Sequence, residues 1–159
     1  MSLMANPMDA LQSYQRRFDT APIDSSQLDA SYLKLSGKVN GGKKYDFVKI
    51  VDGQVHALAI FGEEESFNGV ARYSVGYAVS ESQRGRGLAV EAVNKGIEEL
   101  KKEFDRMRMN SFYVEALIDV TNTHSIAVAK RLFSGPGFAK TDSETGTPSL
   151  LFYRLVAIQ

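Results

Sequence analysis

Hydrophobic and polar positions change their spacing several times along this chain, and each spacing predicts a different element. Apolar residues recur at three- and four-residue steps between Ala89 and Met107, which predicts an amphipathic helix. Runs rich in β-branched and aromatic residues at 73–79 and 111–119 predict a strand on each side of this helix. The order strand, helix, strand implies two parallel strands joined by a right-handed crossover.

Antiparallel hairpins are predicted before and after this unit. Apolar-rich runs at 45–51 and 54–61 are joined by Asp52-Gly53, the strongest short hairpin signal in the sequence. The second run is expected to end in a polar loop over 62–66. A last hairpin is predicted within 138–158, around a polar turn.

Helices are predicted at three further places, so the chain should form an α+β fold with a mixed sheet. Residues 8–18 and 26–35 carry mixed helical periodicity, and the polar residues 24–25 are expected to cap the second of these segments. Asn122 is expected to cap a helix that runs to about Phe133.

Composition narrows the classes of function. The 159 residues suit a single domain over 1–159, in which residues 1–7 are expected to be a disordered segment or an expression scar. Nineteen basic and nineteen acidic residues leave no net charge, so electrostatic capture of nucleic acid or an anionic membrane is not indicated. The chain has no cysteine and only two histidines, so neither a disulfide framework nor a metal site is expected.

The sequence also carries no targeting signal. Its first residues lack the basic start and apolar run of a secretory signal, and no stretch approaches the ~20 apolar residues of a spanning helix. We therefore expect a cytoplasmic protein, as a monomer or homodimer.

The stretch between the first predicted strand and the long helix has the composition of an anion-binding loop: Arg84, Gly85, Arg86, Gly87, Leu88 and Ala89. The first N–H groups of a helix lack intrahelical partners and favour negative charge. The glycines allow close approach of the backbone, and the arginines add positive charge. At this point an ordinary loop that happens to contain two glycines remains an equal alternative.

Two well-known nucleotide loops do not fit. The segment 41–44 supplies neither the spacing nor the hydroxyl of a P-loop. A dinucleotide fingerprint that starts at Gly85 would need glycine or alanine where Val90 stands.

The pattern Arg84-x-x-Gly87-x-Ala89 resembles the Q/R-x-x-G-x-G/A pyrophosphate loop of the GNAT superfamily of acyl-CoA-dependent N-acetyltransferases. Asn122-x-x-Ser125, after the next predicted strand, is similar to the family's N-x-x-S helix start. The resemblance is greatest to the branch of ribosomal-protein N-terminal acetyltransferases. It implies a GNAT fold, with a mostly antiparallel sheet, splayed parallel central strands and flanking helices.

The resemblance also implies a place for acetyl-CoA. The pantetheine arm would lie between the splayed strands and pair with backbone at Ala78 and Val79, where an N–H would polarise the thioester carbonyl. Asn122 would bond the pantetheine amide. A simple helix cap is the alternative role for Asn122, and both roles can hold together.

The implied reaction is acetyl transfer from acetyl-CoA to a primary amine, on a small molecule or a protein or peptide N-terminus, by direct attack and without metal. The tyrosine and glutamate that many family members use fall on Ala129 and Leu117. Ser125 is then the candidate proton donor, and a serine that only bonds backbone is the alternative. Glu115 and His124 are the candidate bases.

These departures keep other functions open. A non-catalytic acyl-CoA-binding or regulatory domain of the same fold is the main alternative, and a nucleotide-binding module is a more distant one. Gly137-Phe138 resembles the family's closing glycine-phenylalanine but comes about a turn late. Residues 133–136 therefore look inserted, near the acceptor side.

Overall fold

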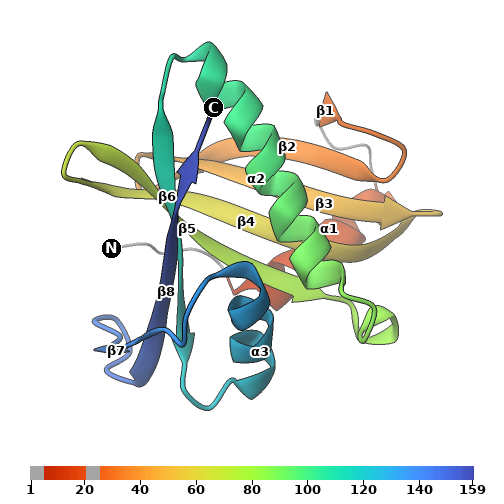
Figure 1. Ribbon diagram of the computed structural model, residues 1–159. Coiled ribbons are helices and arrows are strands. Elements are labelled where there is room, and N and C mark those ends of the chain that lie inside the picture. Colours follow the sequence, from red (N-terminus) through yellow and green to blue (C-terminus); the bar gives the residue numbers. More distant parts are fainter. Residues whose placement is uncertain (1–5, 21–25) are drawn as a thin grey trace.

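A computed structural model describes residues 6–20 and 26–159 of the chain (Figure 1). Its elements, in order, are α1 (Pro7–Thr20), β1 (Ser26–Gln27), β2 (Tyr32–Val39), β3 (Gly42–Val51), β4 (Gln54–Phe67), β5 (Val70–Val79), the 3-10 helix η1 (Glu81–Gln83), α2 (Leu88–Arg106), β6 (Ser111–Asp119), α3 (Thr123–Leu132), β7 (Phe138–Thr141) and β8 (Pro148–Ala157). Among these described elements, no helix combines the length and apolar character that crossing a membrane requires.

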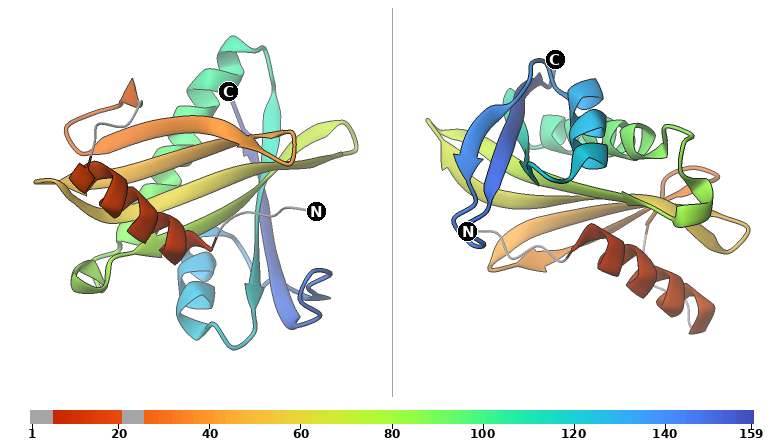
Figure 2. Two further views of the ribbon diagram at one scale, coloured as in Figure 1. Left: turned by 180° about the vertical axis from the view of Figure 1, so that it is seen from behind. Right: turned by 90° about the horizontal axis from the view of Figure 1, so that it is seen from below.

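The strands form one mixed sheet in the order β1-β2-β3-β4-β5-β6-β8-β7. Neighbouring strands are antiparallel except β5 and β6, which are parallel and are connected through α2. Figure 2 shows α2 and α3 on one face of the sheet and α1 on the other. The predicted α+β fold with parallel central strands is confirmed.

Three hairpins along β2 to β5 turn through the same backbone conformation. Both residues of Asn40-Gly41, Asp52-Gly53 and Asn68-Gly69 have positive φ, as the twist of a two-residue hairpin requires. The third turn extends β4 to Phe67, so the polar loop predicted over 62–66 is wrong. An exposed hairpin arm needs no apolar residues, because its backbone groups are paired with β5.

The predicted helix over 26–35 is also wrong, because this segment contains β1 and the start of β2. Tyr32 packs in the core on the α2 side, whereas Leu33 and Leu35 pack beneath α1, which is the two-residue period of a strand. The caps expected at 24–25 lie outside the described residues. The other predicted strands and helices are confirmed, with ends shifted by a few residues.

The structure describes the last two residues of the segment 1–7, Asn6 and Pro7, at the start of α1. The side chain of Asn6 accepts a hydrogen bond of 2.9 Å from the N–H of Met8, and Pro7 is the first helical residue. Both are favoured at a helix start, since they satisfy or remove N–H groups that the helix leaves unpaired.

Gly96 lets α2 lie directly on the sheet. A Cβ at this position would stand 2.4 Å from Phe61 and 2.9 Å from Phe47, whose rings meet edge to face at 5.7 Å. The main core thus fixes α2, and through it the loop at the start of α2, against β3 and β4.

Candidate active site

The parallel strands β5 and β6 pair over only three residues and then separate. Arg72 to Ser74 pair with Tyr113 to Glu115, and no pairing of the two strands continues beyond these positions. A cavity of about 710 Å³ occupies the opening. Seven residues predicted from the sequence line it: Ala78, Val79, Arg84, Ala89, Asn122, His124 and Ser125.

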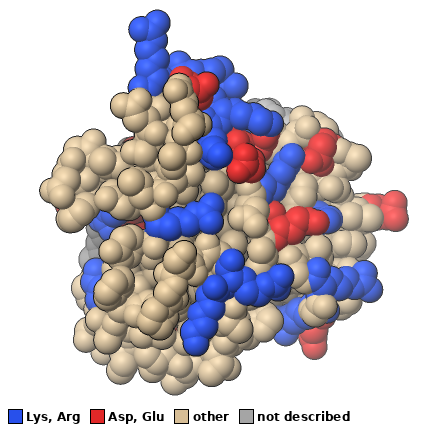
Figure 3. Space-filling view, in the orientation of Figure 1, with Lys and Arg blue, Asp and Glu red and all other residues tan. Residues whose placement is uncertain are grey.

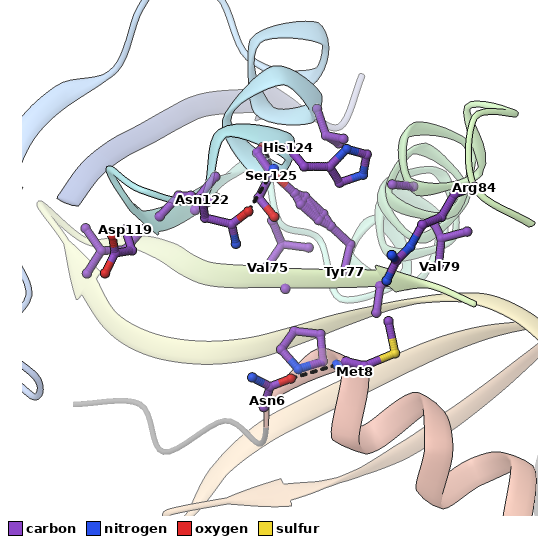
Figure 4. A pocket seen from close by; sticks show the side chains of 18 residues that line it. Asn6, Met8, Val75, Tyr77, Val79, Arg84, Asp119, Asn122, His124 and Ser125 are labelled. Atoms are coloured by element: carbon purple, nitrogen blue, oxygen red, sulfur yellow. Dashed lines mark hydrogen bonds between the residues drawn. The ribbon is translucent and has the colours of Figure 1, made fainter. Parts of the chain in front are cut away.

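This cavity passes through the sheet. His124 and Ser125 line it from α3, whereas Asn6 and Met8 line it from the start of α1 on the opposite face (Figure 4). Residues from both faces of the sheet therefore line the same space.

The start of α2 presents free N–H groups beside one opening. Gly87 is the N-cap with φ +72°, and its carbonyl accepts the first bond of the helix from the N–H of Glu91. The N–H groups of Leu88, Ala89 and Val90 consequently have no partner in the helix. This is the arrangement that binds phosphate groups at helix starts.

The structure places the other predicted loop residues beside the cavity rather than in its wall. Gly85 and Arg86 are exposed, and the side chain of Leu88 packs against the main core. Any contact of these residues with a ligand would lie outside the cavity, where the loop meets solvent.

Arg131 is a basic residue at this loop that the sequence analysis missed. Its guanidinium nitrogens lie 3.9 Å from where a Cβ of Gly87 would stand. Within the described chain, Arg131, Arg84 and Arg86 have no carboxylate within ion-pair distance. Figure 3 shows basic side chains gathered over α3 and the start of α2. In the sequence Arg131 is one of two basic residues ending a helix, which is ordinary there.

Asn122 caps α3, as predicted. Its side-chain oxygen accepts a hydrogen bond of 3.1 Å from the N–H of Ser125. The hydroxyl of Ser125 makes no hydrogen bond to the residues that the structure describes, and Ser125 lines the cavity. The hydroxyl of Ser125 is therefore not hydrogen-bonded to the described backbone.

Tyr77 is a second residue that the sequence analysis missed. It extends from β5 to α3, where its hydroxyl donates a hydrogen bond of 2.7 Å to the carbonyl oxygen of Ser125 (Figure 4). Burial raises its pKa above the ordinary value, so the hydroxyl stays protonated. An aromatic residue in a predicted strand indicates only packing, and nothing in the sequence connects it to α3.

Backbone direction distinguishes Val79 from Ala78. The N–H of Ser80 donates to the carbonyl of His56, towards β4. Successive N–H groups of a strand point to opposite sides, so that of Ala78 also faces β4, whereas that of Val79 faces the opening towards β6.

Glu115 lies outside the cavity wall, at the closed end of the opening, where it pairs with Ser74 of β5. Its carboxylate is ion-paired with Arg72. Burial raises the pKa of Glu115, and the neighbouring Arg72 opposes this shift.

Ala129 and Leu117, which stand where many family members have the tyrosine and the glutamate, differ in their surroundings. Ala129 is fully buried, whereas Leu117 lines the cavity with 40 % of its surface exposed.

A family model described as an acetyltransferase (GNAT) domain matches residues 9–132. The chain belongs to the GNAT acetyltransferases. The match includes most of the cavity lining, the loop before α2 and helix α3, so the resemblance found from the motifs is confirmed. A search of curated proteins finds no match to this GNAT chain.

Solved structures share the fold at low sequence identity. A ribosomal-protein-S5-alanine acetyltransferase from Vibrio fischeri aligns with 18 % identity and a TM-score of 0.55, over 72 % of this chain and 62 % of its own. A ribosomal-protein-alanine N-acetyltransferase from Brucella melitensis aligns with 20 % identity and a TM-score of 0.54, over 71 % of this chain and 69 % of its own. Mycobacterium smegmatis RimJ, solved with CoA-disulfide, aligns with 21 % identity and a TM-score of 0.53, over 72 % of this chain and 54 % of its own. The GNAT chain thus spans between about half and two thirds of these proteins.

Proposed function

We propose that this GNAT chain transfers an acetyl group from acetyl-CoA to a primary amine by direct attack. The observation that carries the proposal is a cavity lined by residues from both faces of the sheet, with the free N–H groups of a helix start beside it. Such a cavity lets donor and acceptor meet without sharing one path.

The donor is assigned to the opening beside α2. The free N–H groups at the start of α2 would hold its diphosphate, with Arg84, Arg86 and Arg131 supplying positive charge. The pantetheine arm would lie along β5 and bond the backbone of Val79. The side-chain amide of Asn122 would bond an amide of the arm while its oxygen remains the helix cap.

The reaction then needs three groups of this chain. The amine nitrogen attacks the thioester carbon, and the N–H of Val79 stabilises the oxyanion that forms. The carbon–sulfur bond breaks and the departing thiolate takes a proton from the hydroxyl of Ser125, which regains one from the protonated base or from water. Before the attack, the acceptor ammonium, with an ordinary pKa of about 10, loses its proton to His124 directly or to Glu115 through water.

A non-catalytic acyl-CoA-binding domain remains the second candidate. The observation in its favour is that Ala129, at the place of the usual tyrosine, is fully buried and carries no proton donor. Such a domain would bind the donor in the same cavity and turn nothing over.

Two measurements test these functions. Acetyl-CoA should raise the melting temperature, and a panel of peptides, polyamines, aminoglycosides and amino acids should contain an amine that releases CoA. Ser125→Ala and His124→Ala should lower that release, and Glu115→Gln should lower it less, because Glu115 lies outside the cavity wall. Binding of CoA without release by any amine would favour the non-catalytic domain. Stabilisation by ATP or NAD and none by CoA would reject both.

A further inference from the structure

Four aromatic rings form a continuous row across the outer face of the C-terminal half of the sheet. Phe67 contacts Tyr113 with ring centres 6.0 Å apart, Tyr113 contacts Tyr153 at 6.3 Å, and Tyr153 stacks on Phe138 at 5.7 Å. The rings come from β4, β6, β8 and β7, so the row runs across the strands. We call these four residues the aromatic row.

The aromatic row is open to solvent. Phe138 is 61 % exposed, Phe67 55 % and Tyr153 47 %. In Figure 2, α1 lies over the strands on the β5 side of the opening between β5 and β6, and α2 and α3 lie on the opposite face of the sheet. No helix of the described residues covers the row, and an apolar surface of this kind commonly marks a binding site.

The aromatic row is connected to the cavity by a short apolar path. Leu117 lines the cavity and pairs with Leu151 of β8, which in turn pairs with Phe138 of β7. Two spacings between strands place Phe138 about 10 Å from the cavity wall. A second hollow of about 260 Å³ lies at this end of the path, between the turn at 134–137 and β8.

The charges at the cavity indicate which ligand approaches from this side. Arg84 and Asp119 lie at opposite ends of the cavity (Figure 4). Asp119 accepts hydrogen bonds from the backbone and hydroxyl of Thr121, and these bonds lower its pKa and keep it negative. The Arg84 end suits the phosphates of the donor, and the Asp119 end suits an ammonium group.

We propose that the acceptor is the N-terminal amine of a peptide that carries an aromatic side chain far enough along to span the distance from the cavity wall to Phe138, about 10 Å, and that this side chain binds on Phe138 and Tyr153. This inference rests on the proposed function. A peptide whose third residue is aromatic carries this chemistry, because two extended residues span about 7 Å and the third side chain covers the remainder.

Matched acceptors test the proposal. The pairs are 4-phenylbutylamine with butylamine, and the tripeptide amides Ser-Ala-Phe with Ser-Ala-Ser. Wild-type protein should prefer the aromatic member by at least about tenfold in kcat/KM, as burial of much of a phenyl ring provides. A preference in the peptide pair supports the proposal, whereas a preference in the amine pair alone would assign the surface to a small amine and overturn it.

Variants of the surface complete the test. Phe138→Ser and Tyr153→Ser should each remove most of the preference, with acetyl-CoA affinity as the check of folding. Met107→Ser is the matched control, since Met107 is 49 % exposed at the far end of α2, and it should keep the preference. Equal kcat/KM within both pairs, or a preference that survives in both row variants, would overturn the proposal.

Two further readouts separate this inference from its premises. If no amine releases CoA, the proposed function fails, and calorimetry of Ser-Ala-Phe amide with CoA-loaded protein then tests whether the surface binds the aromatic side chain. Binding that both row variants lose supports the surface, and absence of binding overturns it. Sedimentation of the free protein addresses a second copy as the occupant. A dimer that Phe138→Ser converts to monomer would assign the row to self-association and overturn the proposal.

Discussion

The hydroxyl of Tyr77 on β5 is hydrogen-bonded at 2.7 Å to the carbonyl oxygen of Ser125 on α3. This bond joins β5 to α3 beyond the three residues over which β5 and β6 pair, and both residues line the cavity. It links the start of α3, where Asn122 and Ser125 lie, to β5, along which the pantetheine arm would lie.

Tyr77→Phe removes this bond and keeps the ring. We expect kcat/KM for acetyl-CoA to fall by about two- to tenfold, since a net hydrogen bond contributes about 0.5–1.5 kcal/mol. Steady-state kinetics with one fixed amine provide the measurement. If Tyr77 only packs, the variant will match wild type, because phenylalanine preserves the packing.

Arg131→Ala tests whether α3 contributes to binding the diphosphate. Affinity for acetyl-CoA should fall about fivefold at low salt, and by less at high salt, because a partly exposed charge is screened. Turnover of S-acetylpantetheine, which has no diphosphate, should not change. Lys130→Ala removes the same charge one residue away and serves as the control. An equal loss with both donors would mean that Arg131 acts through the fold instead.

Gly87→Val tests the close approach of backbone to phosphate. The variant should lose more than about tenfold in CoA affinity, because a branched side chain would cover the free N–H groups at the start of α2. Gly53→Val is the control, since Gly53 has a similar φ of +76° and open space around it, on a distant hairpin. Comparable affinity in the two variants would show that backbone strain, and not the phosphate site, causes the loss.

Local signals explain which elements could be predicted. Asp52-Gly53 fixes its hairpin through its own backbone conformation, and Asn122 caps α3 through a bond three residues away. The segment 26–35 was misjudged because its alternating burial exists only once α1 covers one face of the sheet and α2 the other. Pairing over long distances in sequence, and not propensity, decides such a strand.

The site could be predicted from the sequence only where a short stretch of neighbouring residues carries the chemistry. The loop before α2 and the Asn122-x-x-Ser125 pattern are short and contiguous. The contacts of Tyr77 with Ser125 and of Arg131 with Gly87 join positions more than forty residues apart. No local pattern marks such contacts, because the sheet and the crossover through α2 create them.

Acid should reveal the role of Asp119 in the turn before α3. Its folded pKa is lowered, so the stabilisation by its carboxylate is full above the unfolded pKa of about 3.9 and is lost as pH falls through the folded value. The difference in unfolding free energy between wild type and Asp119→Asn should be constant near neutral pH and shrink below about pH 4. Urea unfolding across this range measures it, and a difference independent of pH would contradict the assignment.

Gly96→Val should destabilise the fold where α2 meets the sheet. The new Cβ would stand 2.4 Å from the ring of Phe61, inside a core with no free space, and overpacking costs about 1–3 kcal/mol. Gly37→Val is the matched control, because Gly37 lies in β2 with no atom within 4 Å of its Cβ position, and valine suits a strand. Urea unfolding should show a lower free energy for the first variant alone. Because α2 carries the phosphate-binding loop, the same variant should also bind acetyl-CoA more weakly, and unchanged affinity would mean that the loop is positioned independently of this contact.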